Sequence, residues 1–76
     1  MDQKTKNLNL LVLYLSSWEE DSRKQPGVKV YRTWKGFRFD VLNQLERENL
    51  IRQYKQSLIL TDEGLRKALE LESQIL

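Results

Sequence analysis

The chain has 76 residues, 39% of them hydrophobic and 32% charged, with a formal net charge of +2 and with neither cysteine nor histidine. This composition is that of a folded globular domain, and it excludes a disordered chain, a disulfide-stapled scaffold and a metal site built from Cys or His. At this length we expect residues 1–76 to form a single domain with one small core, and nothing in the sequence predicts a cofactor.

The first predicted element is a helix over residues 4–18 that is apolar on most of its circumference. Its apolar residues are Leu8, Leu10, Leu11, Val12, Leu13, Tyr14, Leu15 and Trp18. One apolar face is sufficient for the core of so small a domain, so we expect another chain to cover a second face. The alternative is that the whole helix packs inside the monomer.

Residues 19–33 are predicted to be a loop, with a turn at Pro26-Gly27 and a weak strand-like alternation over residues 28–31. A loop of this length in a compact domain is often functional or mobile. Between residues 22 and 39 the chain has no acid, and its basic residues are Arg23, Lys24, Lys29, Arg32, Lys35 and Arg38. Such clustering fits a nucleic-acid footprint, and an ordinary solvated loop is the alternative.

The segment that follows, residues 34–37, is predicted to bring the chain back to the core. Gly36 permits a positive φ or a close approach of the backbone at this turn. Trp34 and Phe37 are predicted to be core or lid residues, and an exposed aromatic binding platform is the alternative.

An amphipathic helix is predicted over residues 39–48, with Phe39, Leu42 and Leu45 facing inward and Val41 beside them. Asp40 lies in the first turn, where the helix dipole favours an acid. Asn49 is expected to end the helix in the left-handed conformation.

Two short strands, residues 51–54 and 58–61, are predicted to form a hairpin with its tip at residues 55–57. Thr61 then caps a last helix over residues 62–75. The apolar stripe of this helix is wider than docking on a small core requires, which again indicates a homodimer. The predicted dimer interface consists of Leu10, Leu13, Tyr14, Leu69, Leu71 and Ile75.

One pattern runs through about half of the chain and consists of Arg32, Trp34-Lys35-Gly36-Phe37, the leucine-rich helix, and Leu60-Thr61-Asp62-Glu63-Gly64. With this pattern the chain resembles a family of small uncharacterised bacterial and archaeal proteins. The chain departs from the family pattern at Asn49, where glycine is more common, and at Gln56, where lysine is common. The same half is similar to the last helix and wing of bacterial winged-helix transcription regulators. That resemblance implies an α+β winged helix of order helix, loop, helix, strand, strand, helix, and it favours DNA binding.

In a winged helix that reads DNA, the helix at residues 39–48 would enter the major groove and the wing would contact phosphates. Arg pairs with guanine and Asn or Gln with adenine, while lysines bind phosphate. The predicted nucleic-acid-binding residues are Lys29, Lys35, Arg38, Asn43, Gln44, Arg47, Arg52 and Lys55. The loop in place of a supporting helix, and Glu46 and Glu48 on or near the reading helix, weigh against DNA. The alternative is a homodimeric protein-interaction module that does not bind DNA.

Neither an enzyme nor a membrane protein is expected. Without His or Cys, catalysis would depend on carboxylates, Lys, Tyr or Ser, and the sequence has neither a nucleophile motif nor a glycine-rich phosphate loop. The apolar run after the first lysines is short and is interrupted by Asn9, unlike a signal peptide or a membrane span. We therefore expect a cytoplasmic protein.

Overall fold

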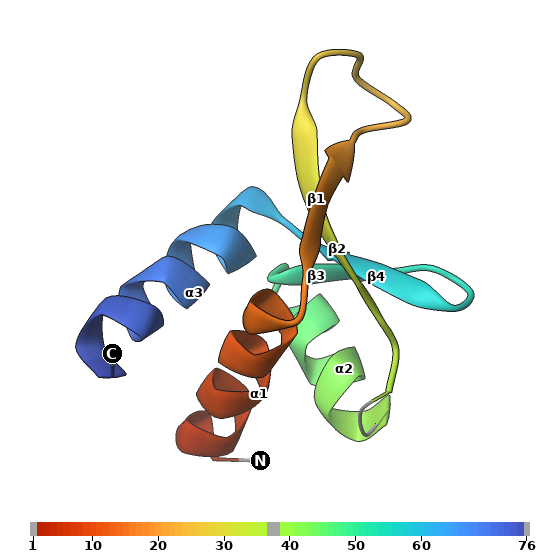
Figure 1. The fold of residues 1–76 in the computed structure, drawn as a ribbon. Coiled ribbons are helices and arrows are strands. Elements are labelled where there is room, and N and C mark those ends of the chain that lie inside the picture. The colour runs from red at the N-terminus through yellow and green to blue at the C-terminus, as the bar shows by residue number, and fades with distance from the viewer. Residues whose placement is uncertain (1, 37–38, 76) are drawn as a thin grey trace.

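The computed structural model describes residues 2–36 and 39–75. Within these ranges it is an α+β domain of three helices and an antiparallel sheet of four strands (Figure 1). The elements in chain order are α1 (Gln3–Leu15), β1 (Trp18–Asp21), β2 (Lys29–Trp34), α2 (Phe39–Arg47), β3 (Ile51–Gln53), β4 (Ser57–Leu60) and α3 (Asp62–Ile75). The predicted α+β class is confirmed, and α3 spans the residues predicted for it.

The strands lie in the order β1-β2-β4-β3, so β2 pairs with β4 although a helix and a strand separate them in the chain. Figure 1 shows that the β1–β2 hairpin extends away from the helices, while the β3–β4 hairpin runs across it. The prediction of a loop over residues 19–33 is therefore wrong for most of that segment, which belongs to the β1–β2 hairpin, although the strand-like alternation over residues 28–31 overlaps β2.

Side-chain pairs across β1 and β2 explain this difference. The Lys29 Nζ donates to Asp21 Oδ1 at 2.5 Å, and the Tyr31 hydroxyl donates to Glu19 Oε2 at 3.1 Å. Acidic residues are poor strand formers by themselves, so the acidic run at residues 19–21 gives no strand signal in the sequence. Opposite charges across antiparallel strands stabilise the pairing once each acid faces a donor.

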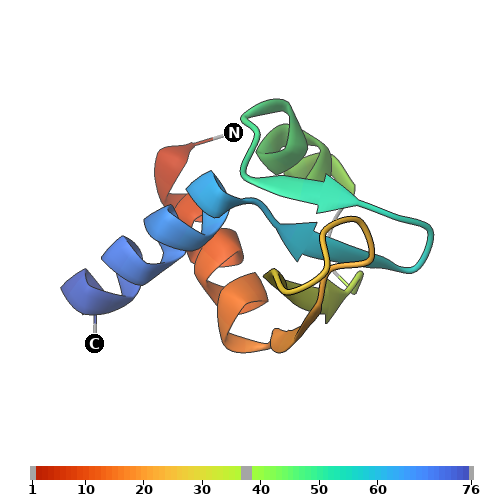
Figure 2. The same ribbon diagram turned by 90° about the horizontal axis from the view of Figure 1, so that it is seen from above.

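The helices cover one face of the sheet, and the core lies between them and the strands. Figures 1 and 2 show α1 and α3 side by side, with α2 against β3. The core consists of Leu10, Leu13, Val41, Leu42, Leu45, Leu50, Ile51, Leu58, Leu60, Ala68 and Leu71. No helix within the described residues is long and apolar enough to cross a membrane.

The turns and caps agree with the sequence at two of three predicted positions. Asn49 has a φ of 61°, as predicted for a left-handed cap, and the Gly64 N–H donates to the Thr61 hydroxyl at 3.0 Å. Gly36 does not have a positive φ and has no neighbour within 4 Å of where a Cβ would be. The close approach is at Gly64 instead, where a Cβ would lie 1.8 Å from the Leu50 carbonyl oxygen.

Burial corrects part of the predicted dimer interface. Leu10 and Leu13 are 0% exposed and Leu71 is 9% exposed, so these leucines belong to the domain's own core. The sequence could not separate them from the surface leucines of α1, because that helix is apolar nearly all round. Phe39 is also corrected, since it is 67% exposed and does not face inward.

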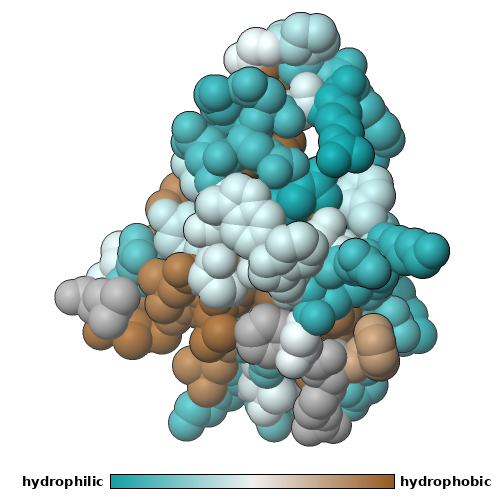
Figure 3. Space-filling view, turned by 45° about the vertical axis from the view of Figure 1, so that its right-hand side comes forward, coloured by the Kyte–Doolittle hydropathy of each residue, from teal (hydrophilic) through white to brown (hydrophobic). Residues whose placement is uncertain are grey.

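Other apolar side chains on α1 and α3 do lie at the surface. These exposed residues are Leu8, Val12 and Leu15 on α1 and Leu69 and Ile75 on α3, and we call them the helical apolar strip. In Figure 3 hydrophobic residues gather over the lower part of the molecule, where the helices lie, whereas hydrophilic residues cover the β1–β2 hairpin. Tyr14 is half-buried and packs against Tyr31, with ring centroids 6.1 Å apart.

Candidate functional site

The helices pack against one face of the sheet, and the opposite face points away from that packing. Thr33 on β2 and Leu58 and Leu60 on β4 are buried toward the helices. Since side chains alternate along a strand, their neighbours point to the opposite side. We call this side the open sheet face; its residues are Trp18, Glu20, Val30, Arg32, Trp34, Arg52, Tyr54, Ser57 and Ile59.

The strand register arranges these side chains in rows across the sheet. Trp34 lies opposite Ser57, and the Tyr54 N–H donates to the Ser57 carbonyl at 2.8 Å, so Trp34 and Tyr54 lie at the two ends of one row. Two strand spacings separate them, which is about 10 Å. In the next row Ile59 of β4 is the central residue, with Arg32 of β2 on one side and Arg52 of β3 on the other.

Arg32 is held at the centre of the open sheet face. Its Nε donates to Glu20 Oε1, one of its terminal nitrogens donates to Ser57 Oγ at 2.8 Å, and its guanidinium lies 5.2 Å from the centre of the Tyr54 ring. This last distance is within the range of a cation–π contact. The positive charge of Arg32 is therefore largely compensated within the domain, and its planar group supports Tyr54.

Glu20 fixes a second side chain as well as Arg32. Its other carboxylate oxygen accepts a hydrogen bond from Trp18 Nε1 at 3.1 Å. The hydrogen bond from Arg32, and then that from Trp18, lowers the pKa of Glu20 below its ordinary value. Glu20 therefore carries its negative charge at neutral pH and orients both partners.

The two tryptophans form an aromatic pair on this face. Trp18 and Trp34 have ring centroids 5.4 Å apart and an interplanar angle of 51°. Trp34 is 62% exposed, so the prediction that it is a core or lid residue is wrong and the alternative, an exposed aromatic surface, describes it. Phe37, for which the same prediction was made, lies outside the described residues.

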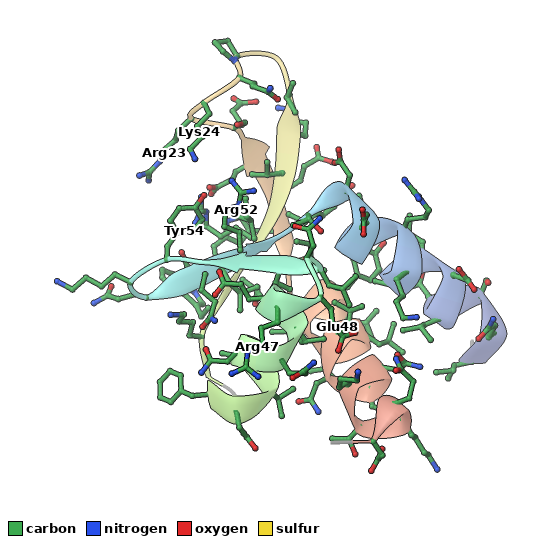
Figure 4. All side chains as sticks on the ribbon, turned by 180° about the vertical axis from the view of Figure 1, so that it is seen from behind. Arg23, Lys24, Arg47, Glu48, Arg52 and Tyr54 are labelled. Atoms are coloured by element: carbon green, nitrogen blue, oxygen red, sulfur yellow. The ribbon has the colours of Figure 1, made fainter. Side chains whose placement is uncertain are left out.

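Basic side chains from both hairpins surround the open sheet face. Arg23 and Lys24 come from the turn between β1 and β2, and Arg52 and Lys55 come from the β3–β4 hairpin. Among the described residues none of these four forms an ion pair, whereas Lys29 is paired with Asp21 and Arg32 with Glu20. Figure 4 shows Arg23, Lys24, Arg52 and Tyr54 on the same side of the β3–β4 hairpin.

The two hairpins and the first turn of α3 line a broad hollow over this face. Its volume is about 1120 Å³, and its lining includes Trp18, Trp34 and Tyr54, the four basic residues named above, and the acids Asp62 and Glu63 of α3. Pockets for small molecules have volumes of roughly 300–1,000 Å³. The hollow is thus large and open enough for an extended ligand.

The predicted nucleic-acid-binding residues are divided between two surfaces. Lys29, Arg52 and Lys55 lie on the hairpins, and Lys35 follows β2, where its N–H donates to the Gln56 carbonyl at 3.2 Å. Asn43, Gln44 and Arg47 lie on α2, which Figure 4 shows on the other side of the β3–β4 hairpin. Arg38 lies outside the described residues.

The polar side chains of α2 bond to one another and to β3. Gln44 Nε2 donates to Glu48 Oε2 at 2.8 Å, and an Arg47 nitrogen donates to Gln44 Oε1 at 3.3 Å. Asn43 Oδ1 accepts from Gln53 Nε2 at 3.0 Å, and Glu46 accepts from the same amide. This helix surface therefore combines acids with amides that already have partners.

Sequence reasoning did not include Trp18, Glu20 and Tyr54 of the open sheet face in the site. It placed Arg23, Lys24 and Arg32 in a basic segment that fits a nucleic-acid footprint, but not among the predicted binding residues. One signal was present, because the spacing of Arg32 and Trp34 places both on the same face of a strand. The contribution of β1 had no comparable signal, since that strand was not recognised.

Comparison with known proteins identifies the family of the chain and no individual relative. No curated protein and no solved structure matches it. One family matches from residue 1 to residue 76, which is the whole length. The chain belongs to the family described as a domain of unknown function, DUF6429.

Proposed function

We propose that this protein is a nucleic-acid-binding domain and not an enzyme, and that it binds through the two hairpins and the open sheet face. One observation carries the proposal: Arg23, Lys24, Arg52 and Lys55 converge on one hollow without ion-pair partners among the described residues. Unpaired basic side chains around a groove attract a phosphate backbone and release its counterions on binding.

A winged-helix ancestry of the core is part of this proposal. It is supported by the order α2, β3, β4 and by the pairing of β4 with the upstream strand β2. In that arrangement the β3–β4 hairpin is the wing, which contacts phosphates in winged-helix proteins. The β1–β2 hairpin takes the place in the chain where a supporting helix would precede the reading helix.

The proposal moves the binding surface away from α2. Asp40 and Glu46 on α2 would place negative charge against the DNA backbone, whereas the charge of Glu48, just after the helix, is compensated by its ion pair with Lys6. A fully charged acid on a helix in the major groove repels phosphates. On the two hairpins, residues 18–34 and 51–60, basic side chains outnumber acidic ones.

Two matched arginine variants test where nucleic acid binds. Arg52 and Arg47 are both exposed, but Arg52 faces the hollow and Arg47 lies on α2. We expect labelled oligonucleotides to bind the wild-type protein in fluorescence anisotropy at about 50 mM salt and to bind far more weakly at about 200 mM. Arg52→Ala is expected to weaken binding by roughly three- to ten-fold, the effect of one phosphate contact, while Arg47→Ala leaves it unchanged.

The reverse pattern, with Arg47→Ala weakening the complex and Arg52→Ala not, would restore α2 as the reading helix. Absence of binding to any single-stranded or duplex oligonucleotide at low salt would end the proposal.

A second candidate function, self-association, is favoured by the helical apolar strip. Leu8, Val12 and Leu15 are spaced so that they form one stripe along the exposed side of α1, and Leu69 is exposed on the neighbouring helix α3. Contiguous exposed apolar patches mark interfaces in soluble proteins. We propose that a second copy of the chain covers this strip, which leaves the open sheet face available for nucleic acid.

A further inference from the structure

We propose that the open sheet face binds single-stranded nucleic acid, with bases stacked on Trp34 and Tyr54 and phosphates against the surrounding basic residues. This inference rests on the proposed function and specifies its ligand. It follows from three features of the face. Two exposed aromatic rings lie in one row, the arginine at the centre is neutralised by Glu20, and basic side chains without ion pairs among the described residues surround it.

The aromatic row offers surface that a duplex cannot use. Trp34 is exposed although it packs on Trp18, and Tyr54 is exposed although Arg32 lies against its ring. Trp34 is 62% exposed and Tyr54 38% exposed, so each ring has a supporting contact and keeps surface open to solvent. In a duplex the base faces are already stacked on one another, whereas a single strand presents them to aromatic side chains.

Support for these rings reduces the entropy cost of binding. Trp18 is tied to Glu20 and packs on Trp34, while Arg32 is tied to Glu20 and Ser57 and packs on Tyr54. Glu20 is a positioning residue in this arrangement, because it orients the two side chains that contact the stacking rings. Side chains that are already ordered lose less freedom when a ligand arrives.

The charge pattern favours a strand that crosses the sheet from one hairpin to the other. Arg32 is neutralised by Glu20 at the centre, where bases would lie. Arg23, Lys24, Arg52 and Lys55 form no ion pair within the described residues and stand around it, where phosphates would lie. Asp62 and Glu63 of α3 also line the hollow, so the phosphates of the strand would follow the basic side chains of the two hairpins. Proteins that bind single strands without strong sequence preference combine a basic groove with aromatic platforms in this way. The carboxylates of an acidic peptide would pair with the surrounding basic side chains, but no group of the peptide would stack on the rings of Trp34 and Tyr54.

The protein provides its own reporter for the test. It has two tryptophans, Trp18 and Trp34, and both lie on the open sheet face, so its intrinsic fluorescence arises next to the proposed bases. We would titrate it with single-stranded oligonucleotides of about ten nucleotides, within the range of ~4–16 nucleotides for such sites. Single-stranded DNA, single-stranded RNA of the same sequence, the matching duplex, and polyglutamate would be compared.

We expect the single strands to quench the tryptophan fluorescence and the duplex and polyglutamate not to do so. Tyr54→Ala keeps both tryptophans and is expected to weaken single-strand binding by roughly ten-fold or more. Trp34→Ala is expected to have an effect of similar size in anisotropy. Phe39→Ala removes an exposed aromatic side chain from α2 and serves as the matched control, with no expected change.

The possible results distinguish the stacking of single-stranded bases on this face from nucleic-acid binding in general. Duplex and single strand bound equally, without quenching and with equal sensitivity to Arg52→Ala, would overturn stacking while leaving nucleic-acid binding intact. Equal quenching by polyglutamate would also overturn it, because a general polyanion surface would then be sufficient. Absence of binding to all the oligonucleotides would reject both. A preference between the two single strands identifies whether RNA or DNA is the ligand, since only RNA has the 2′-hydroxyl.

Discussion

At the scale of single residues, Gly64 is the glycine at which the fold has no room for an added side chain. It lies in the first turn of α3, directly against the backbone of Leu50, and a Cβ there would come 1.8 Å from the Leu50 carbonyl oxygen. The neighbour is backbone and cannot rotate away, so α3 or the segment before β3 would have to shift. We expect Gly64→Ala to lower the free energy of unfolding by about 3 kcal/mol, at the upper end for overpacking, in urea denaturation.

Gly36 supplies the control for this substitution. It has no neighbour within 4 Å of a built Cβ and no positive φ. Gly36→Ala is therefore expected to leave stability unchanged or to raise it by about 0.5 kcal/mol, because alanine restricts the unfolded chain. A Gly64→Ala protein as stable as the wild type would show that α3 can move away from Leu50 at little cost.

At the scale of elements, one ion pair joins α1 to the end of α2. Lys6 Nζ lies 2.5 Å from Glu48 Oε2, and the Lys6 side chain is only 13% exposed. The hydrogen bond from Lys6, followed by that from Gln44, lowers the pKa of Glu48 below its ordinary 4.5. A lowered carboxyl pKa contributes stability above the unfolded pKa, and that contribution is lost as the pH falls through the folded pKa.

Glu48→Gln is therefore expected to lower the free energy of unfolding by about 0.5–1 kcal/mol at neutral pH. The difference from the wild type should shrink as the pH falls below 4.5, when the wild-type carboxyl also becomes neutral. Glu70→Gln is the control, since Glu70 is exposed and forms no ion pair within residues 2–36 and 39–75. A difference that persists unchanged at low pH would assign the effect to packing.

The elements also show what the sequence predicts and what it hides. The helix at α3 follows from Thr61, the acids after it and the apolar spacing, and the left-handed cap follows from Asn49, because these signals are local. Strand β1 depends on partners about ten residues away, Lys29, Tyr31 and Arg32, and its acids carry no strand signal of their own. The open sheet face was missed for the same reason, since Trp18 and Glu20 reach it only through that pairing.

At the scale of the whole molecule, charged and apolar surfaces are separated. The hairpins carry Arg23, Lys24, Arg52 and Lys55, and α1 and α3 carry the helical apolar strip. Figure 3 shows hydrophilic residues over the β1–β2 hairpin and hydrophobic residues over the lower part of the molecule. The sequence predicted both a basic segment and a dimer surface. It could not choose among the leucines of α1, because a helix that is apolar nearly all round does not reveal which side the sheet will cover.

The proposed dimer can now be tested with residues that do not support the core. Leu13→Lys would bury a charge at a fully buried position and unfold the domain, so it cannot report on association. Leu8 and Leu69 are exposed, and we expect Leu8→Lys combined with Leu69→Lys to give a folded monomer in analytical ultracentrifugation, where the wild type sediments as a dimer. Val28→Lys, at an exposed position of the β1–β2 hairpin, should leave the dimer intact. A wild-type protein that is monomeric at about 100 μM, or a double variant that still dimerises, would remove this interface, and any nucleic-acid binding would then be that of a single domain.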